Sequence, residues 1–239
     1  MRNLLLLVFL IAVSFGNAVK AQTVAHHAFQ KATRAAQNND YQSALKLYQQ
    51  ALAESDSLKF MRGDFLTRIH YNLGVCFYHL NQPETALQEY AAAIETSGGT
   101  YQKAFRGRAM AEVELKNWRA ASENFNRALQ LNARDAESWF DLGVVLLAEK
   151  NYSSAAAAFR QAIANGSVAS AAGHNNLGVI AALDNDLDRA EKEFKIALRE
   201  SLDPFPEASQ NLLFCRARRA NKFAKSQFSF SNQTQNLGD

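Results

Sequence analysis

Proline and glycine are scarce in this chain, which has three prolines and eleven glycines in 239 residues. So few turn-forming residues favour a helical fold over one with many tight turns. An excess of charge is also lacking, because 26 basic residues face 23 acidic ones, for a formal net charge of +3. This balance argues neither for nor against a polyanionic partner.

The sequence signatures of catalytic and metal sites are absent. The chain contains no Gly-rich phosphate loop, no His-Glu-x-x-His motif, no nucleophile elbow and no Cys-x-x-Cys pair. His26 and His27 are adjacent, so a helix would direct their rings to different sides, which makes a poor metal chelate. We therefore expect no enzyme, no cofactor and no metal site.

Only one long hydrophobic run occurs, from Leu4 to Phe15. It is too short for a bilayer span, which needs about 20 residues. A basic residue precedes it, and residues 19–21 place small side chains where a signal peptidase reads. We interpret residues 1–21 as a secretory signal peptide cleaved before Gln22, with a retained anchor as the alternative. The mature protein is then expected to be periplasmic or extracellular, with no transmembrane segment.

What the chain does contain is an internal repeat. A small-aromatic-small triple recurs five times, and its separations of four and three residues put all three side chains on one helical face. The small residues let a neighbouring helix approach closely, and the aromatic ring fills the space between them. The triples are Ala44-Tyr48-Ala51, Ala86-Tyr90-Ala93, Ala121-Phe125-Ala128, Ala155-Phe159-Ala162 and Ala190-Phe194-Ala197.

Each triple follows a helix-start signal in the same register. Asn or Asp, the residues whose side chains cap helix N-termini, stand four residues before the first alanine at four of five places. At the fifth place Gln82 is followed by Pro83, which suits the first helical position. The five positions are Asp40, Gln82, Asn117, Asn151 and Asp186.

The helix before each start signal carries a small residue twelve places ahead of the first alanine. Glycine inside a helix costs about 1 kcal/mol relative to alanine, so we expect a close helix contact wherever the chain uses it. The row consists of Ala32, Gly74, Ala109, Gly143 and Gly178.

The pattern closely resembles a tetratricopeptide repeat (TPR), whose period is about 34 residues. Residues 136–169 match best, through Trp139, Leu142-Gly143, Leu146, Ala155, Phe159 and Ala162. The resemblance implies an all-α right-handed superhelix of about five helical hairpins plus a C-terminal capping helix. One domain at 22–225 is expected, with repeats at 25–58, 67–100, 102–135, 136–169 and 171–204, a cap at 206–225 and a disordered tail at 226–239.

The first two triples are 42 residues apart, longer than the usual period. The surplus lies around Ser57 to Leu66, and we expect a lengthened third helix or a longer loop, with Gly63-Asp64 as a break. Cys76 and Cys215 would lie four repeats apart, about 40 Å at roughly 10 Å per helix layer. A disulfide needs Cα atoms within about 7 Å, so we expect free thiols.

In such a superhelix the first helix of each hairpin lines the concave side, which is the expected binding groove. Asparagines recur there two residues before the small-residue row or its equivalent in the cap. Their amides can donate to and accept from a peptide backbone at once, while aromatic rings offer apolar contact and a basic pair could meet a carboxylate. The alternative is that these residues only solvate the groove and pack between repeats. The candidates are Tyr71, Asn72, Tyr78, Lys103, Arg106, Phe140, Asn175, Asn176 and Asn211.

Some TPR proteins grip the C-terminal carboxylate of a chaperone with a two-carboxylate clamp. Asn72 and Lys103 match that pattern, but Phe29, Thr33 and Gly107 stand where a lysine, an asparagine and an arginine are needed. The incomplete clamp counts against a co-chaperone role.

The expected cap is basic, and we interpret it as a solvated helix end that keeps the stack soluble. An anionic lipid surface or an acidic protein is the alternative partner for it. Too few aromatic residues interleave the basic ones to suggest nucleic acid. The basic residues are Arg216, Arg218, Arg219, Lys222 and Lys225.

These features predict an exported, non-catalytic scaffold that binds a peptide or protein segment in its groove, within an envelope or secretion assembly. One alternative is self-association into homo-oligomers, through the stack or through the segment near Phe60 and Phe65. The other is an accessory subunit of an envelope enzyme.

Overall fold

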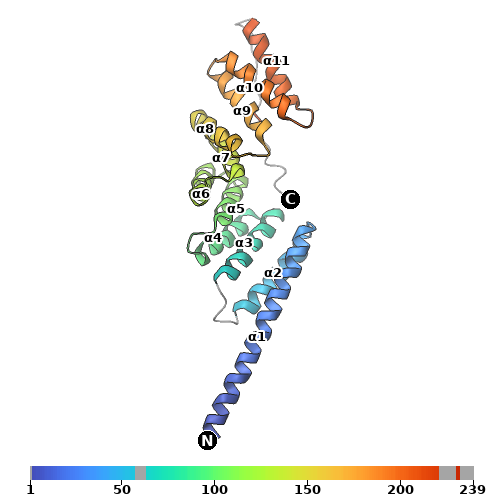
Figure 1. The fold of residues 1–239 in the computed structure, drawn as a ribbon, viewed down its shortest axis with the longest axis vertical. Coiled ribbons are helices and arrows are strands. Elements are labelled where there is room, and N and C mark those ends of the chain that lie inside the picture. The colour runs from blue at the N-terminus through green and yellow to red at the C-terminus, as the bar shows by residue number, and fades with distance from the viewer. Residues whose placement is uncertain (1, 57–62, 221–229, 232–239) are drawn as a thin grey trace. The chain divides into compact units, whose positions relative to one another are not determined.

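The computed structural model describes residues 2–56, 63–220 and 230–231, with side chains from residue 19 onward, and the regular structure in these ranges is entirely helical. This confirms the all-α expectation. The helices are α1 (Arg2–Gln37), α2 (Tyr41–Asp56), α3 (Gly63–His79), α4 (Pro83–Thr96), α5 (Gln102–Glu114), α6 (Trp118–Leu131), α7 (Ala136–Ala148), α8 (Tyr152–Ala164), α9 (Ser170–Leu183), α10 (Leu187–Glu200) and α11 (Pro206–Ala220), shown in Figure 1.

The chain forms two compact units, residues 1–116 and 117–239. The boundary falls in the turn of the third expected repeat, so α5 belongs to the first unit and α6 to the second. The repeat period gives no sign of this division, because it continues across the boundary.

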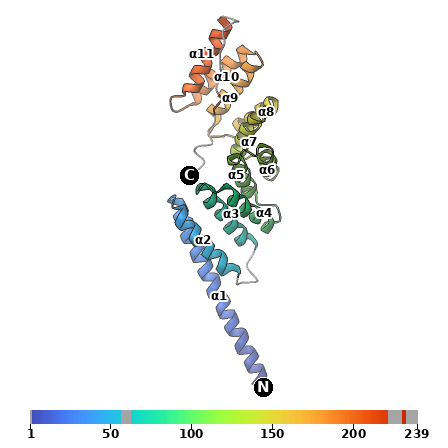
Figure 2. The same ribbon diagram turned by 180° about the vertical axis from the view of Figure 1, so that it is seen from behind.

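Within each unit, consecutive helices pack side by side as hairpins. In the first unit α1 packs on α2 and α3 on α4, and α5 follows against α4. In the second unit α7 packs on α8 and α9 on α10, while α11 lies against α10 and also touches α9 (Figure 2). The hairpin expected from the repeat is therefore the building block of both units.

The turn between the two helices of each expected repeat has the same backbone geometry. One residue at each turn has a left-handed backbone, with φ between 57° and 62° at Asn39, Asn81, Lys116, Lys150 and Asn185. In four of these turns the next N–H donates to a carbonyl five residues back, over 2.8 to 2.9 Å. This arrangement satisfies carbonyls at the end of the first helix and stops it.

Helix caps follow these turns largely as the sequence predicts. The Asp40 side chain accepts a hydrogen bond from the Ser43 N–H at 3.1 Å. Hydrogen bonding from the Ser43 side chain, together with this N–H, holds the pKa of the Asp40 carboxyl below its usual value. Asn151 and Asp186 cap α8 and α10 in the same way. Asn117 stands at the expected position, but its side chain makes no capping bond to α6.

The small residues of the first helices meet the aromatic rings of the second helices. A Cβ built on Gly74, Gly143 or Gly178 would lie 2.6 to 2.7 Å from the ring carbons of Tyr90, Phe159 or Phe194, respectively. This confirms the close helix contact expected at the glycines.

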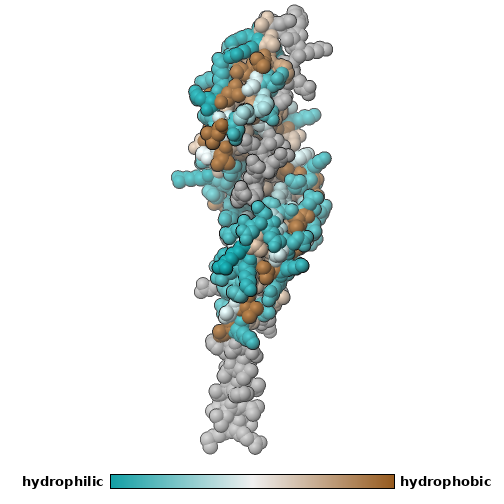
Figure 3. Space-filling view, turned by 90° about the vertical axis from the view of Figure 1, so that its right-hand side faces the viewer, coloured by the Kyte–Doolittle hydropathy of each residue, from teal (hydrophilic) through white to brown (hydrophobic). Residues whose placement is uncertain are grey.

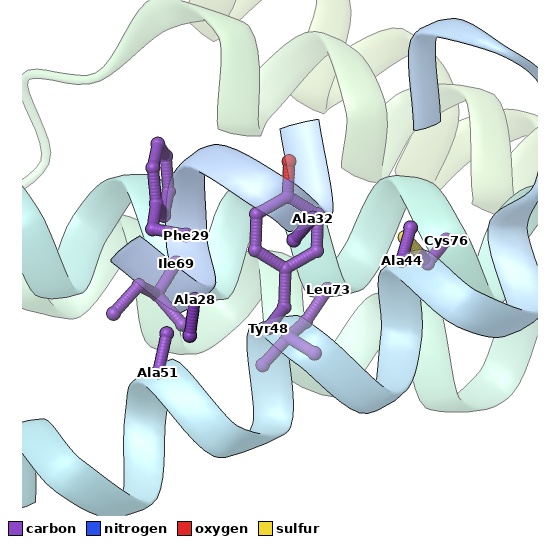
Figure 4. Close-up of a cluster of buried hydrophobic side chains, with 9 residues drawn as sticks. All are labelled: Ala28, Phe29, Ala32, Ala44, Tyr48, Ala51, Ile69, Leu73 and Cys76. Carbon is purple, nitrogen blue, oxygen red and sulfur yellow. The ribbon is translucent and has the colours of Figure 1, made fainter. Parts of the chain in front are cut away.

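In the core of the first unit, hairpin α1–α2 has an alanine, Ala32, at the place where hairpins α3–α4, α7–α8 and α9–α10 have glycine. Tyr48 of α2 is buried among side chains of α1, α2 and α3, including Ala32 and Leu73 (Figure 4). The Phe29 ring meets the Tyr48 ring edge-on, with centroids 5.3 Å apart.

The surplus between the first two repeats is partly helical. Helix α3 begins at Gly63, so Gly63-Asp64 starts a helix, whereas we had expected a break there. The rest of the surplus, residues 57–62, lies outside the described residues, as do residues 221–225 of the expected cap. At the other end, the backbone of α1 is helical across the expected cleavage site before Gln22. Among the described residues, no helix has both the length and the hydrophobicity needed to cross a bilayer.

Candidate peptide-binding site

Three asparagines of the second unit form a buried polar row. Asn175 and Asn176 lie in the middle of α9, Asn211 lies in the first half of α11, and all three are 0% exposed. The contact of Gly178 with the Phe194 ring holds this part of α9 against α10. Buried amides are costly unless each finds hydrogen-bond partners, so the partners of this row show what it is built to hold.

The partner of the row is the backbone of Ser231, in the C-terminal tail (residues 226–239). The Ser231 N–H donates to Asn176 Oδ1 at 2.6 Å, and Asn176 Nδ2 donates back to the Ser231 carbonyl at 3.0 Å. One amide side chain therefore satisfies both backbone groups of one residue, as a neighbouring β-strand would. We expected an asparagine of the groove to pair in this way with the backbone of a partner, and that role stays a prediction.

The other two asparagines extend this contact into a chain of hydrogen bonds. Asn175 Nδ2 donates to Ser231 Oγ at 2.8 Å, and Asn211 Nδ2 donates to Asn175 Oδ1 at 2.9 Å. Asn211 thus orients Asn175, and Asn175 binds the hydroxyl group of Ser231. Such a chain favours a small hydroxyl side chain at this position, whereas Asn176 reads the backbone alone.

Phe230 supplies the apolar part of the same contact. Its side chain is partly buried and packs against two core clusters of the second unit, one centred on Phe140 and Phe159 and one on Phe194. The ring stacks on Tyr152 with centroids 6.5 Å apart. An aromatic ring in such a place anchors a segment at low entropic cost.

A cleft of about 420 Å³ borders Ser231. It is lined by the loops before α9 and before α11, and two of its side chains, Val168 and Leu202, are 90% and 101% exposed. On the face shown in Figure 3, hydrophobic residues form separate patches within a largely hydrophilic surface. The cleft therefore adds a mixed polar and apolar surface next to Ser231.

Three first-unit candidates have partners within their own unit. Asn72 Nδ2 donates to the Arg68 carbonyl of its own helix at 2.8 Å. The Tyr71 ring packs against the rings of Tyr90 and Tyr101, and burial raises the pKa of the Tyr71 hydroxyl. The Tyr78 hydroxyl donates to Glu114 at 3.2 Å. These contacts match the packing alternative of the sequence analysis more closely than an open groove.

The remaining three candidates are scattered. Lys103 is exposed and Arg106 is half-buried, both on α5. Phe140 is 2% exposed and packs its ring on Phe159 with centroids 5.4 Å apart, which corrects our expectation that it lines the binding groove. Its burial follows from the small residues around it, which leave room for two rings between α7 and α8.

Polar residues elsewhere serve packing. His70 bonds to Glu89 at 2.8 Å and His174 bonds to Glu193 at 2.7 Å, at the same separation of 19 residues. Within the described ranges, no three potential metal ligands come together.

The basic capping helix α11 is tied to α10. Arg216 and Arg219 pair with Glu191, Arg219 also pairs with Asp188, and Arg218 donates to the Ala182 carbonyl at 3.2 Å. The expectation of a merely solvated cap is therefore incomplete for these three arginines. Lys222 and Lys225 lie outside the described residues.

Sequence reasoning named the three asparagines as candidates, and it did not predict that Ser231 contacts two of them. The tail was expected to be disordered because it is rich in Ser, Gln and Asn, yet Phe230 and Ser231 make defined contacts. The available signal was the order of residues 228–231, where Phe and Ser alternate within an otherwise polar tail. The other tail residues lie outside the described ranges.

Comparison with known proteins identifies the fold. The sequence profile described as "Tetratricopeptide repeat" matches residues 29–100, 106–170 and 151–206, more than half of the chain. No curated protein sequence matches significantly.

Solved structures with the same fold share little sequence with this chain. BtubC from P. vanneervenii is 20% identical, with a TM-score of 0.65 over 93% of this chain and 95% of its own. MamA from Desulfovibrio magneticus RS-1 is 14% identical, with a TM-score of 0.64 over 74% and 94%. YrrB, described as a TPR protein with an unusual peptide-binding site, is 21% identical, with a TM-score of 0.59 over 74% and 86%. Identities this low establish a shared fold alone.

Proposed function

The chain belongs to the tetratricopeptide repeat family, and we propose that it is a non-catalytic scaffold whose second unit binds an extended segment of another protein. The observation that carries this proposal is the pair of hydrogen bonds between Asn176 and the backbone of Ser231. These bonds use groups that every non-proline residue has, so the site suits an extended backbone in general. YrrB, with the same fold, is described as having a peptide-binding site, which supports this class of ligand.

The test is a change at Asn176 compared with a matched change at Asn72. Both asparagines stand two residues before the glycine of a first helix, but the Asn72 amide is bonded within its own helix. Peptides would be selected from a displayed library on the full-length protein carrying Ser231→Pro, which removes the Ser231 N–H that bonds to Asn176. Their affinities would then be measured again with Asn176→Leu or Asn72→Leu added to that protein. Each hydrogen bond is worth about 0.5–1.5 kcal/mol, so losing two predicts roughly a tenfold or greater loss for Asn176→Leu and little change for Asn72→Leu.

Circular dichroism melting of each variant checks that the fold is retained. If Asn176→Leu lowers helicity, Asn176→Asp, which keeps the size and removes the donor, replaces it. Selected peptides that bind all variants equally would place the binding surface elsewhere and contradict the proposal.

We also propose that the scaffold works outside the cytoplasm, in the periplasm or beyond, within an envelope or secretion assembly. The support is the apolar run at Leu4–Phe15 followed by a peptidase-type site. In a secretion-competent host, mass spectrometry of the periplasmic fraction is expected to find a chain beginning at Gln22. Changing Leu6 and Leu7 to lysine should leave the chain uncleaved, and an intact N-terminus on exported protein would show a retained anchor.

A further inference from the structure

The described part of the C-terminal tail lies where a partner segment would lie. Ser231 is 7% exposed, and its N–H, carbonyl and hydroxyl groups all bond to Asn175 or Asn176. Phe230 is anchored beside Tyr152 at the same time. A second backbone cannot use the Asn176 amide while Ser231 holds both its donor and its acceptor.

We propose that Phe230–Ser231 is an internal ligand of the second unit, which an external segment must displace before it can bind. This proposal rests on the peptide-binding function proposed above and adds regulation and ligand chemistry to it. The expected partner segment has the chemistry of its competitor, which is an extended backbone with an aromatic residue followed by a small hydroxyl residue.

The ligand chemistry follows from three separate contacts. Asn176 requires a free backbone N–H, which excludes proline at the Ser231 position. Asn175, oriented by Asn211, favours a hydroxyl there. The place occupied by Phe230, beside Tyr152 and two core clusters, favours an aromatic residue immediately before it.

Tethering makes the internal segment an effective competitor even if its own affinity is modest. Nine residues, 221–229, join the end of α11 at Ala220 to Phe230, and a short linker gives an effective concentration in the millimolar range. With a Kd near 100 μM for the isolated segment, a tether at about 1 mM would weaken an external ligand roughly tenfold.

The experiment uses the full-length chain and a labelled peptide with the sequence SQFSFSNQ, residues 226–233. The variant Ser231→Pro removes the tail's N–H donor without touching the helices. The variant Ser226→Pro makes the same exchange five residues earlier, outside the described contact, and is the matched control. Fluorescence anisotropy would measure the affinity of the peptide for the three proteins. A second peptide, N-methylated at the residue equivalent to Ser231, tests the backbone contact.

The expected result is at least tenfold tighter peptide binding by Ser231→Pro than by the natural chain or by Ser226→Pro, with no binding of the N-methylated peptide. Equal affinities of the peptide for the three proteins would contradict the proposal that Phe230–Ser231 is an internal ligand. The proposed function would survive that result if the N-methylated peptide still failed to bind. If the peptide bound none of the three proteins, the proposal of an internal ligand would also be wrong. The peptide-binding function would still be tested separately, by the library selection with Asn176→Leu.

Sedimentation equilibrium separates an internal tail from the tail of a second copy. A monomer at all concentrations is expected for the natural chain. A dimer that Ser231→Pro abolishes would show exchange of tails between copies and would overturn the internal form of the contact.

Discussion

At the scale of single residues, a glycine of the first helix lies against an aromatic ring of the second helix in hairpins α3–α4, α7–α8 and α9–α10. Phe159 is fully buried, and its ring carbons come within 2.6 Å of the place where a Cβ on Gly143 would stand. No buried ring can yield that much space without moving its neighbours, since interiors are close-packed. The absent methyl group at Gly143 therefore sets the distance between α7 and α8.

Gly143→Ala is accordingly expected to destabilise the second unit. Overpacking costs about 1–3 kcal/mol, and the better helix propensity of alanine offsets about 1 kcal/mol of it. The net fall in the free energy of unfolding is expected to be up to about 2 kcal/mol, measured by urea denaturation. Gly173→Ala in α9 is the control, because its Cβ would meet only the flexible end of Ile163 at 3.3 Å. An equal loss in both variants would show that the ring contact does not set the spacing.

At the scale of helices, the sequence predicted type, order and start points well because each depends on local chemistry. Caps at Asp40, Asn151 and Asp186 and the ring contacts at the glycines recur at fixed spacing, so one motif identifies all its copies. The left-handed turn residues were not identified, because Lys116 and Lys150 carry no signal of the kind that the asparagines at the other turns carry.

The candidate site was predictable only in part, for a related reason. The asparagine row of α9 and α11 follows from the repeat register. Whether an amide faces an open groove or its own helix depends on neighbouring side chains, which is why Asn72 and Asn176 differ. The occupant of the row was not predictable, because a contact between Ser231 and Asn176 spans 55 residues and leaves no periodic pattern.

At the scale of the whole molecule, the chain consists of two compact units, and each contains one buried cysteine. Cys76 lies in the first unit and Cys215 in the second, and both thiols are free. Burial raises the pKa of the Cys76 thiol to about 12, and burial also raises the pKa of the Cys215 thiol. The reactive thiolate of Cys76 is therefore nearly absent from the folded protein at pH 8, and that of Cys215 is less abundant than in an exposed cysteine.

Each compact unit is expected to unfold cooperatively on its own. Pulsed alkylation at pH 8 across a urea series is therefore expected to label the two cysteines at different midpoints. The folded protein should react slowly at both sites, and the fully unfolded chain should react quickly at both. Peptide mapping by mass spectrometry assigns each midpoint. Coincident midpoints would mean that the two units unfold as one cooperative body.

The paired histidine and glutamate described in both units have a practical consequence. Hairpin α3–α4 has a bond between His70 and Glu89, and hairpin α9–α10 has the equivalent bond between His174 and Glu193. Both hairpins also have the glycine–ring contact. Because these two hairpins have the same contacts between their helices, we expect that one can replace the other in the sequence. A designer could splice one in place of the other, or insert an extra copy, to lengthen the array while transplanting Asn175 and Asn176 to a new location along it.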